Sequence, residues 1–375
     1  MMNPSIFQYM PETVRFAILR LGSNCNCKDS FIFSDARCDI NSVTDERRVM
    51  LVKNFNNIFR RGIEFINEVK DGNQSFESLD RQHKAALSVL NSFVNEKELH
   101  EKSLSSILDQ LQNGEVSDVE MTVALGEHLL GRLAPGQSCV INSKVNGKER
   151  CSCQLDHCMK IAKFGNTGIG HEAVWHGFVD IMFPSFESVE PECIATITNP
   201  VAIESRPTMK KTRVNSEEDG SQGTGVHITS TQSVVDKSVA ETIVFSLIQK
   251  NHRPSLRNHL IPHIIISSSD FRILMYDAVN DVFLCSVLLP LFQDKCLHIT
   301  SVIIIWMVLH YRLFCSGIDI EPRKLEQVHS NFRNLSREKW EVYSGSLKSC
   351  VGRFPIVSQE FFPSNDLMLL GTENF

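Results

Sequence analysis

Apolar residues recur at intervals of three and four over much of the first third of the chain, which is typical of helices with one buried face. One of these helices is expected to begin at Ser117, because Ser-Asp-Val-Glu forms a capping box there. The pattern predicts helices over residues 42–71, 79–93, 99–111 and 117–134. Residues 1–115 are therefore expected to form a mainly helical N-terminal region.

The pattern changes after this region to short apolar runs rich in β-branched residues, which are typical of strands. Strands are expected over residues 137–148, 178–183, 189–202, 261–267, 271–276 and 282–289. Helices are expected from Ser233 or Asp236 to about Asn251, over Ile299–Phe314, and from Pro322 to about Tyr343. The order predicts an α/β (α+β) fold with a mixed central sheet flanked by helices and preceded by the helical region.

These elements divide the chain into three parts, of which the helical N-terminal region is the first. The α/β core is expected to span residues 116–320 and to be followed by a C-terminal helix and tail over 321–375. Within the core, the polar and glycine-rich stretch 208–225 is expected to be a mobile loop.

The stretch from Gly170 to Pro184 stands out because it places Asp180 inside the apolar run Phe-Val-Asp-Ile-Met-Phe. We expect a short buried strand with this acid in its middle. A carboxylate in such a place is costly unless a partner, a metal ion or an open cleft satisfies it. Two interpretations follow: Asp180 belongs to a binding site, or it is bonded to a neighbouring N–H or paired with an Arg or Lys.

The order of elements around Asp180 resembles the core of the PD-(D/E)XK nuclease-like superfamily. A helix with Glu127 is followed by a strand, the Asp180 strand, a strand ending at Glu204, a further helix and a strand pair. The resemblance implies hydrolysis of phosphodiesters at a Mg²⁺ ion held by Asp180 and Glu204. A further acid would complete the metal site, and the sequence does not choose between Glu127 and Glu172.

The acid-x-lysine element of that superfamily is altered in this chain. Arg206 stands where the lysine is expected, and Pro207 follows it, while Lys210 and Lys211 offer another register in the expected loop. Arginine can clamp a phosphate but is a poorer activator of water. The sequence therefore predicts a nucleic-acid-processing or nucleic-acid-binding protein, a Mg²⁺-dependent nuclease if active, in which Arg206 favours a catalytically degenerate site.

A non-catalytic scaffold is the alternative function, with the N-terminal helices contacting protein partners. The sequence does not exclude this alternative, because a fold by itself does not determine a function.

Three cysteines, Cys151, Cys153 and Cys158, cluster with His157 and offer ligands that suit Zn²⁺. Zinc sites usually combine two separate pairs of ligands that lie two to four residues apart, and no second Cys-x-x-Cys accompanies this group. The spacing therefore favours reduced, partly buried thiols over a zinc site.

Composition narrows the function and the compartment. A formal net charge of −6 over 375 residues excludes a broadly basic nucleic-acid binder. Any contact with nucleic acid would have to use local basic loops, at residues 210–213 or 252–259. Twelve cysteines without a recognisable signal peptide favour an intracellular protein, cytoplasmic or nuclear. The apolar run inside 297–318 is too short for a membrane span and predicts a buried helix.

Overall fold

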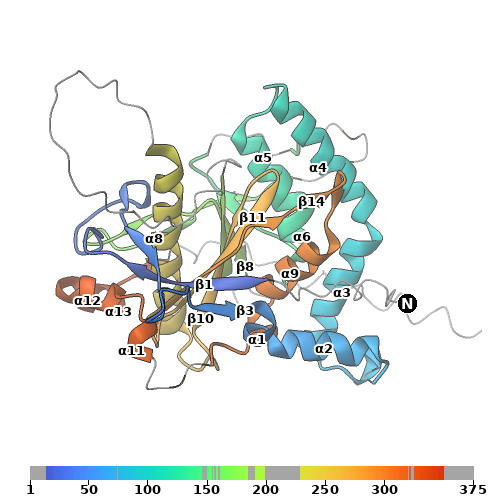
Figure 1. The fold of residues 1–375 in the computed structure, drawn as a ribbon. Coiled ribbons are helices and arrows are strands. Elements are labelled where there is room, and N and C mark those ends of the chain that lie inside the picture. The colour runs from blue at the N-terminus through green and yellow to red at the C-terminus, as the bar shows by residue number, and fades with distance from the viewer. Residues whose placement is uncertain are drawn as a thin grey trace, which may run out of the picture.

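A large mixed β-sheet forms the centre of the protein (Figure 1). The computed structural model describes residues 14–73, 75–145, 150–153, 155, 158, 161–184, 191–198, 229–319, 321 and 325–349. Eleven strands of these residues form the sheet, in the order β2-β1-β12-β11-β10-β9-β8-β4-β5, with β3 paired to β1 and β13 to β11. The predicted α/β fold with a mixed central sheet and flanking helices is confirmed.

The strands of this sheet are short at its edges and longest in its centre. They are β1 (Arg15–Leu21), β2 (Ile40–Ser42), β3 (Val52–Asn54), β4 (Val140–Asn142), β5 (Phe164–Gly165), β8 (Ile181–Pro184), β9 (Pro191–Ile197), β10 (Leu260–Ile266), β11 (Asp270–Asp277), β12 (Val282–Ser286) and β13 (Leu289–Pro290). A small sheet has the order β16-β6-β7, with β6 (Gly168–Gly170), β7 (His176–Phe178) and β16 (Lys348–Ser349). A two-stranded ribbon pairs β14 (Phe292–Gln293) with β15 (Cys296–Leu297).

Most neighbouring strands of the main sheet are antiparallel, but β9 is parallel to β10, and β4 to β5. Parallel neighbours need a crossover connection, which is usually helical. Helix α8 (Thr229–His252) lies between these two strands in the sequence and packs against β10 and β11. This crossover brings the side chains of α8 over the centre of the sheet.

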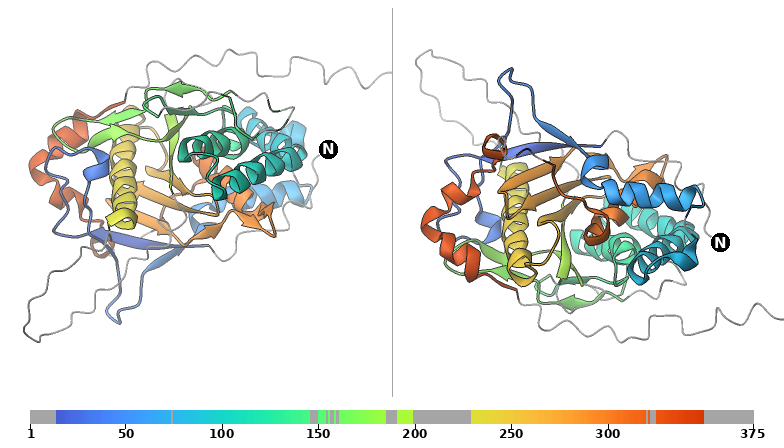
Figure 2. Two further views of the ribbon diagram at one scale, coloured as in Figure 1. Left: turned by 90° about the horizontal axis from the view of Figure 1, so that it is seen from above. Right: turned by 90° about the horizontal axis from the view of Figure 1, so that it is seen from below.

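Helices cover both faces of the sheet (Figure 2). Thr196 of β9 and His263 of β10 hydrogen-bond to residues of α8, so their side chains point to the face that α8 covers. On the opposite face, Gly126 lies against Ile141 and Ile181. The helices on that side are α3 (Arg81–Asn95), α4 (Lys97–Gln112), α5 (Asp118–Leu125), a π-helical turn (Gly126–Leu130), α6 (Gly131–Leu133) and α9 (Ile299–Leu309).

Helix α9 is the apolar helix that the sequence predicted to be buried. Its residues from Ser301 to Leu309 are all buried, and Trp306 donates a hydrogen bond from Nε1 to the carbonyl of Ala86 in α3 at 2.8 Å. A short helix α10 (Tyr311–Phe314) continues it. Among the described residues, no helix combines the length and apolar character needed to cross a membrane.

Two predicted helices differ from the structure. The helix expected from Ser42 begins only at Phe55, with α1 (Phe55–Ile58) and α2 (Arg60–Lys70), because β2 and β3 pair with β1 instead. The C-terminal helix is divided into α11 (Leu325–Val328), α12 (Phe332–Leu335), a 3₁₀ turn and α13 (Trp340–Gly345). The break follows from Asn331, which has a left-handed φ of 68°.

The N-terminal region and the core share one sheet. Strand β1 pairs with β12, so residues 15–21 belong to the central sheet, and the helices of residues 55–112 pack on the same apolar core. The boundaries at 115 and 320 remain predictions. The expected loop 208–225 and the tail after 349 lie outside the described residues.

Candidate functional site

Asp180 does not lie in the middle of a strand, as the sequence suggested, but between two strands of different sheets. β7 ends at Phe178 in the small sheet, and β8 begins at Ile181 in the main sheet. Between them, Thr167 donates to the carbonyl of Val179 at 2.6 Å, and the amide of Asn142 donates to the carbonyl of Asp180 at 3.0 Å. The apolar residues on either side of Asp180 are therefore buried in two separate places.

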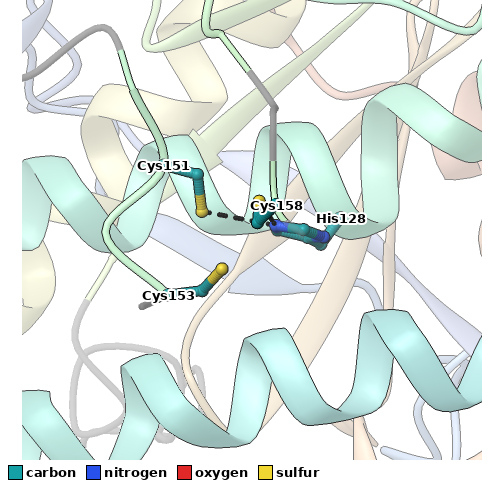
Figure 3. Close-up of side chains that lie close together, drawn as sticks. All are labelled: His128, Cys151, Cys153 and Cys158. Atoms are coloured by element: carbon teal, nitrogen blue, oxygen red, sulfur yellow. Dashed lines mark hydrogen bonds between the residues drawn. The ribbon is translucent and has the colours of Figure 1, made fainter. Parts of the chain in front are cut away.

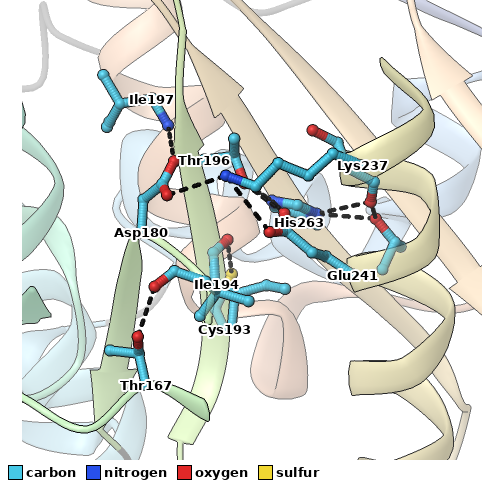
Figure 4. A network of polar contacts seen from close by, with 12 residues as sticks. Thr167, Asp180, Cys193, Ile194, Thr196, Ile197, Lys237, Glu241 and His263 are labelled. Atoms are coloured by element: carbon cyan, nitrogen blue, oxygen red, sulfur yellow. Dashed lines mark hydrogen bonds and ion pairs between the residues drawn. The ribbon is translucent and has the colours of Figure 1, made fainter. Parts of the chain in front are cut away.

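The carboxylate of Asp180 has two partners (Figure 4). It accepts a hydrogen bond from the backbone N–H of Ile197 at 3.0 Å, and one from Lys237 Nζ, also at 3.0 Å. The side chain remains 21% exposed. The structure thus agrees with the interpretation in which Asp180 is paired, and it identifies α8 as the source of the pairing lysine.

Lys237 lies between two carboxylates. Glu241 is one helical turn further along α8, and its Oε1 is 3.6 Å from Lys237 Nζ. Burial alone would lower the pKa of Lys237, but the nearby carboxylates of Glu241 and Asp180 outweigh it, so the pKa is raised. Lys237 is therefore a fixed positive charge that two acids share.

Glu241 is fully buried, and its two oxygens have different surroundings. Oε2 accepts a hydrogen bond from Thr196 Oγ1 at 2.6 Å, whereas Oε1 accepts none from the described residues. Burial raises the pKa of Glu241 to about 7, because the loss of hydration outweighs the attraction of Lys237. The site therefore contains a buried carboxylate oxygen without a donor, next to an ammonium that is beyond hydrogen-bond distance.

His263 on β10 completes the network. Its Nε2 is 3.0 Å from Thr196 Oγ1, and its Nδ1 is 2.8 Å from Thr242 Oγ1. Burial lowers the pKa of His263 to about 3, so the ring is neutral. With the proton on Nε2, His263 donates to Thr196, and Thr196 donates to Glu241, which fixes the orientation of that carboxylate.

This network opens into a pocket of about 320 Å³ between α5 and α8. Asp180 and Lys237 line one wall, and the first turn of α5, with Asp118 and Thr122, lines another. Apolar side chains from α4 and α5, among them Leu111 and Met121, form much of the remainder. The pocket is thus mainly apolar with a few converging charged groups, as is typical of ligand sites.

The two candidates for the additional acid lie elsewhere. Glu127 is buried in the π-helical turn, where it faces Arg132 at 3.7 Å and accepts from the thiol of Cys139 at 3.9 Å. Glu172 is exposed in the turn between β6 and β7. Neither lines the pocket of Asp180, whereas Asp118, on the same helical segment as Glu127, does. Glu204 and Arg206 lie outside the described residues.

Lys237, Glu241 and Asp118 were missed because each occupies an ordinary polar position of a helix in the sequence. The spacing Lys-x-x-x-Glu is a common helical ion pair. It becomes informative only once Asp180 is placed opposite α8, which depends on the order of strands in the sheet.

Of the two groups of basic residues, only residues 252–259 lie among the described residues. Residues 210–213 lie outside them. His252 ends α8, and the 15 positions that separate it from Lys237 correspond to roughly 22 Å along a helix. Arg253, which follows, lies 3.9 Å from the carboxylate of Glu192, and Arg312 also binds Glu192. The basic group at 252–259 is therefore at the far end of α8.

Comparisons with family models, with curated proteins and with solved structures found no match to this chain. The function is therefore argued from the geometry of the site alone.

Proposed function

We propose that Asp180, Lys237 and Glu241, with the pocket that Asp180 and Lys237 line, form a Mg²⁺-dependent phosphodiesterase site, and that the protein processes nucleic acid. One observation carries the proposal. Two carboxylates from a strand end and a helix converge on a single ammonium beside an open pocket, and one buried oxygen, Oε1 of Glu241, has no hydrogen-bond donor among the described residues.

This donor set fits a hard divalent cation. Mg²⁺ is bound in proteins by one or two carboxylates and keeps several waters. Asp180, which lines the pocket, and Glu241, which is buried behind it, would supply these carboxylates once Lys237 Nζ moved from between them. The exposed Asp118 is a further acid in the pocket wall. A bound Mg²⁺ would offset charge on the scissile phosphate and favour ionisation of a water ligand.

The residues of the chain would then have distinct roles. Ile197 N–H and Thr196 hold the carboxylates of Asp180 and Glu241 in fixed orientations. Lys237 contributes a positive charge at the pocket wall, where it can attract a phosphate and orient an attacking water. The apolar side chains of α4 and α5 exclude water from the rest of the pocket.

Lys237 offers a replacement for the lysine that is missing from the acid-x-lysine element at residues 204–206. Arg206 is a poor substitute for the lysine of a PD-(D/E)XK site, and this favoured a degenerate site. Here Lys237 and Glu241, from the helix that follows β9, supply a lysine and an acid beside Asp180. The proposal therefore depends on α8 rather than on residues 204–206.

The order of elements also supports the proposal. The helical segment α5–α6 precedes β4, the antiparallel pair β8 and β9 follows, and α8 crosses over to β10, which is parallel to β9. The resemblance implied a helix, three strands, a helix and a strand pair in this order, with the acid on the second strand, whereas Asp180 directly precedes β8.

The proposal is tested by incubating the full chain with labelled single- and double-stranded DNA and RNA, with Mg²⁺, with Mn²⁺ and with EDTA. Cleavage is expected only with the metal ions. Asp180→Asn and Lys237→Met should each reduce the rate by roughly 10²- to 10³-fold, the effect of removing one charged group that stabilises a transition state. Glu172→Gln is the matched control, since this acid is exposed outside the pocket, and it should cleave at the wild-type rate.

Absence of cleavage of every substrate by the wild type would contradict catalysis, as would an Asp180→Asn variant with full activity. A second measurement, Mg²⁺ titration by calorimetry, separates the alternatives. Binding of Mg²⁺ and of nucleic acid without cleavage would leave a binding protein. The scaffold alternative keeps one supporting observation, the satisfied pairing of Asp180 with Lys237, and it predicts no Mg²⁺ binding at this pocket.

A further inference from the structure

A second cluster of metal-binding side chains lies apart from the Asp180 pocket (Figure 3). His128 projects from the π-helical turn, and Cys151, Cys153 and Cys158 come from the segment that follows β4. All four side chains are buried, and one ligand atom of each lies within 4.8 Å of the other three. The cluster thus contains three sulfurs and one imidazole nitrogen around a common centre.

We propose that His128, Cys151, Cys153 and Cys158 form a closed, structural Zn²⁺ site. Tetrahedral zinc with the usual bond lengths places nitrogen and sulfur ligands about 3.6 Å apart and two sulfurs about 3.8 Å apart. His128 Nε2 lies 3.3 Å from Cys151 Sγ and 3.5 Å from Cys158 Sγ. These two distances are close to those of a zinc site, and Cys153 Sγ lies within 4.8 Å of the same three atoms.

The sequence pattern did not identify the fourth ligand, His128. The cysteines were compared with the adjacent His157, which lies outside the described residues, and their spacing favoured free thiols. His128 is 23 residues before Cys151 and on another element. It reaches the cysteines from a π-helical turn, and such turns are rare and frequently found at functional sites.

The other nitrogen of His128 is also engaged. Its Nδ1 is 3.4 Å from Nδ1 of His100, and Nε2 of His100 is 3.5 Å from the carboxylate of Glu96. His100 is buried and stacks on Phe93 with ring centroids 5.0 Å apart. When Nε2 of His128 binds the ion, Nδ1 of His128 carries the proton and donates to Nδ1 of His100, whose Nε2 faces the carboxylate of Glu96. Carboxylate–histidine pairs orient metal ligands in a similar way. His100 is therefore a positioning residue for His128.

Hydrogen bonds attach the segment around the cysteines to α4 and α5. Ser106 of α4 donates to the carbonyl of Cys153 at 2.8 Å, and Ser152 donates to the carboxylate of Glu120 in α5 at 2.7 Å. A bridge between Arg150 and Ile161 brings the two ends of the segment together. Zinc would join this segment to the helices beside it.

The donor atoms select the metal and its role. Three thiolates and one imidazole are soft ligands that favour zinc over Mg²⁺. Four protein ligands leave no open position for water or substrate, which is typical of structural and not of catalytic zinc. Binding of the ion would displace the thiol protons into solvent, with no change of oxidation state.

The experiment is measurement of metal content in the full, untagged chain by mass spectrometry. One zinc per chain is expected. Cys153→Ser and Cys158→Ser should lose most of it, whereas Cys315→Ser, a matched buried cysteine outside the cluster, should retain one zinc per chain. His100→Ala should still bind zinc, but with an affinity roughly 10- to 100-fold weaker in competition with a chelator.

A test on the wild type does not depend on the folding of variants. Titration with a mercurial that modifies thiols should release zinc to a colorimetric chelator, and replacement by Co²⁺ should give thiolate-to-cobalt charge-transfer bands typical of tetrahedral sulfur coordination. The proposal is overturned by a wild type without zinc that binds none when it is supplied. Full zinc content in Cys153→Ser, or iron with a visible iron–sulfur spectrum, would equally overturn it.

Discussion

The two polar clusters of this protein differ in their ligands and in their access to solvent. The Asp180 site uses oxygen ligands, is partly exposed, and contains an ammonium between its two carboxylates. The His128 cluster uses sulfur and nitrogen ligands, and all its members are buried. Hard ligands beside an open pocket suit an ion that keeps water and meets a substrate, whereas soft ligands in a closed site suit an ion that only holds the fold.

The two clusters also differ in how their polar groups are neutralised when no ion is bound. In the Asp180 site, Lys237 neutralises much of the acidic charge, so the site is stable before any ligand binds. In the other cluster, neutral thiols must lose protons before they bind metal well. Each of the predictions below changes one cluster and leaves the other as an internal reference.

The largest effect on stability is expected from Lys237→Met. Removal of the ammonium leaves Asp180 and the buried Glu241 without a counter-charge, and breaking such a pair costs about 3 kcal/mol, the low end of the range, because Lys237 and Asp180 are partly exposed. Urea unfolding measures the loss. Glu241→Gln in the same chain should restore part of it, and Mg²⁺ should stabilise Lys237→Met more than the wild type.

Lys250→Met on the same helix is the control for this prediction, with a loss under about 1 kcal/mol. Zinc content should be unchanged in both variants. A loss below about 1 kcal/mol for Lys237→Met would mean that Lys237 does not stabilise the two carboxylates.

A smaller effect is expected from Gly131→Ala, directed at the other cluster. A Cβ at Gly131 would lie 2.5 Å from the carbonyl oxygen of Gly126, with which Gly131 N–H closes the π-helical turn. The clash should cost about 1–3 kcal/mol and displace His128, so zinc content should fall as well. Thermal unfolding and metal analysis measure the two effects.

Gly345→Ala is the matched control, because nothing lies within 4 Å of a Cβ at that position. It should be neutral or slightly stabilising. Equal zinc content in Gly131→Ala and in the wild type would show that the π-helical turn does not position His128.

A dependence of stability on pH is also expected, and it originates in Glu241. Its pKa is about 7 in the folded protein, against a reference value of 4.5, so the folded state binds more protons between these two pH values. Stability should therefore fall as pH rises through this window, by at most about 1.4 kcal/mol per pH unit, and level off above it. Urea unfolding at several pH values should show this slope in the wild type but not in Glu241→Gln.

Affinity for Mg²⁺ should change in the opposite direction, since the ion requires the ionised carboxylate and should bind more tightly as pH rises through about 7. Glu172→Gln is the control, and it should keep the wild-type slope. An equal slope in Glu241→Gln would assign the proton uptake to another group.

The sequence predicted elements with a strong local signal better than those that depend on distant pairing. The capping box at Ser117, for example, begins α5 as predicted. By contrast, the apolar residues after Ser42 have helical spacing, but β2 and β3 form because β1 offers hydrogen bonds to them. Local periodicity does not contain that information.

The candidate sites show the same limit. Asp180 could be found because an acid among apolar residues is unusual, but its position between two sheets could not. Lys237 and His128 each lie far along the chain from the residues that they approach, and a lysine or histidine on a helix has no distinguishing local pattern. A single sequence identifies unusual residues, whereas their partners depend on the order of strands and on which face a helix covers.

The pairing of β6 with β16 has a consequence for biosynthesis. β6 pairs with β7, which leads directly to Asp180. On its other side, β6 pairs with β16 (Lys348–Ser349). The chain leaves the ribosome from its N-terminus, so this small sheet cannot be complete until residue 349 has emerged. Strand β1 likewise cannot pair with β12 until roughly 260 further residues have been synthesised. A nascent chain would thus complete the small sheet that leads to Asp180 only near the end of translation, after the cysteine-rich segment has already been made.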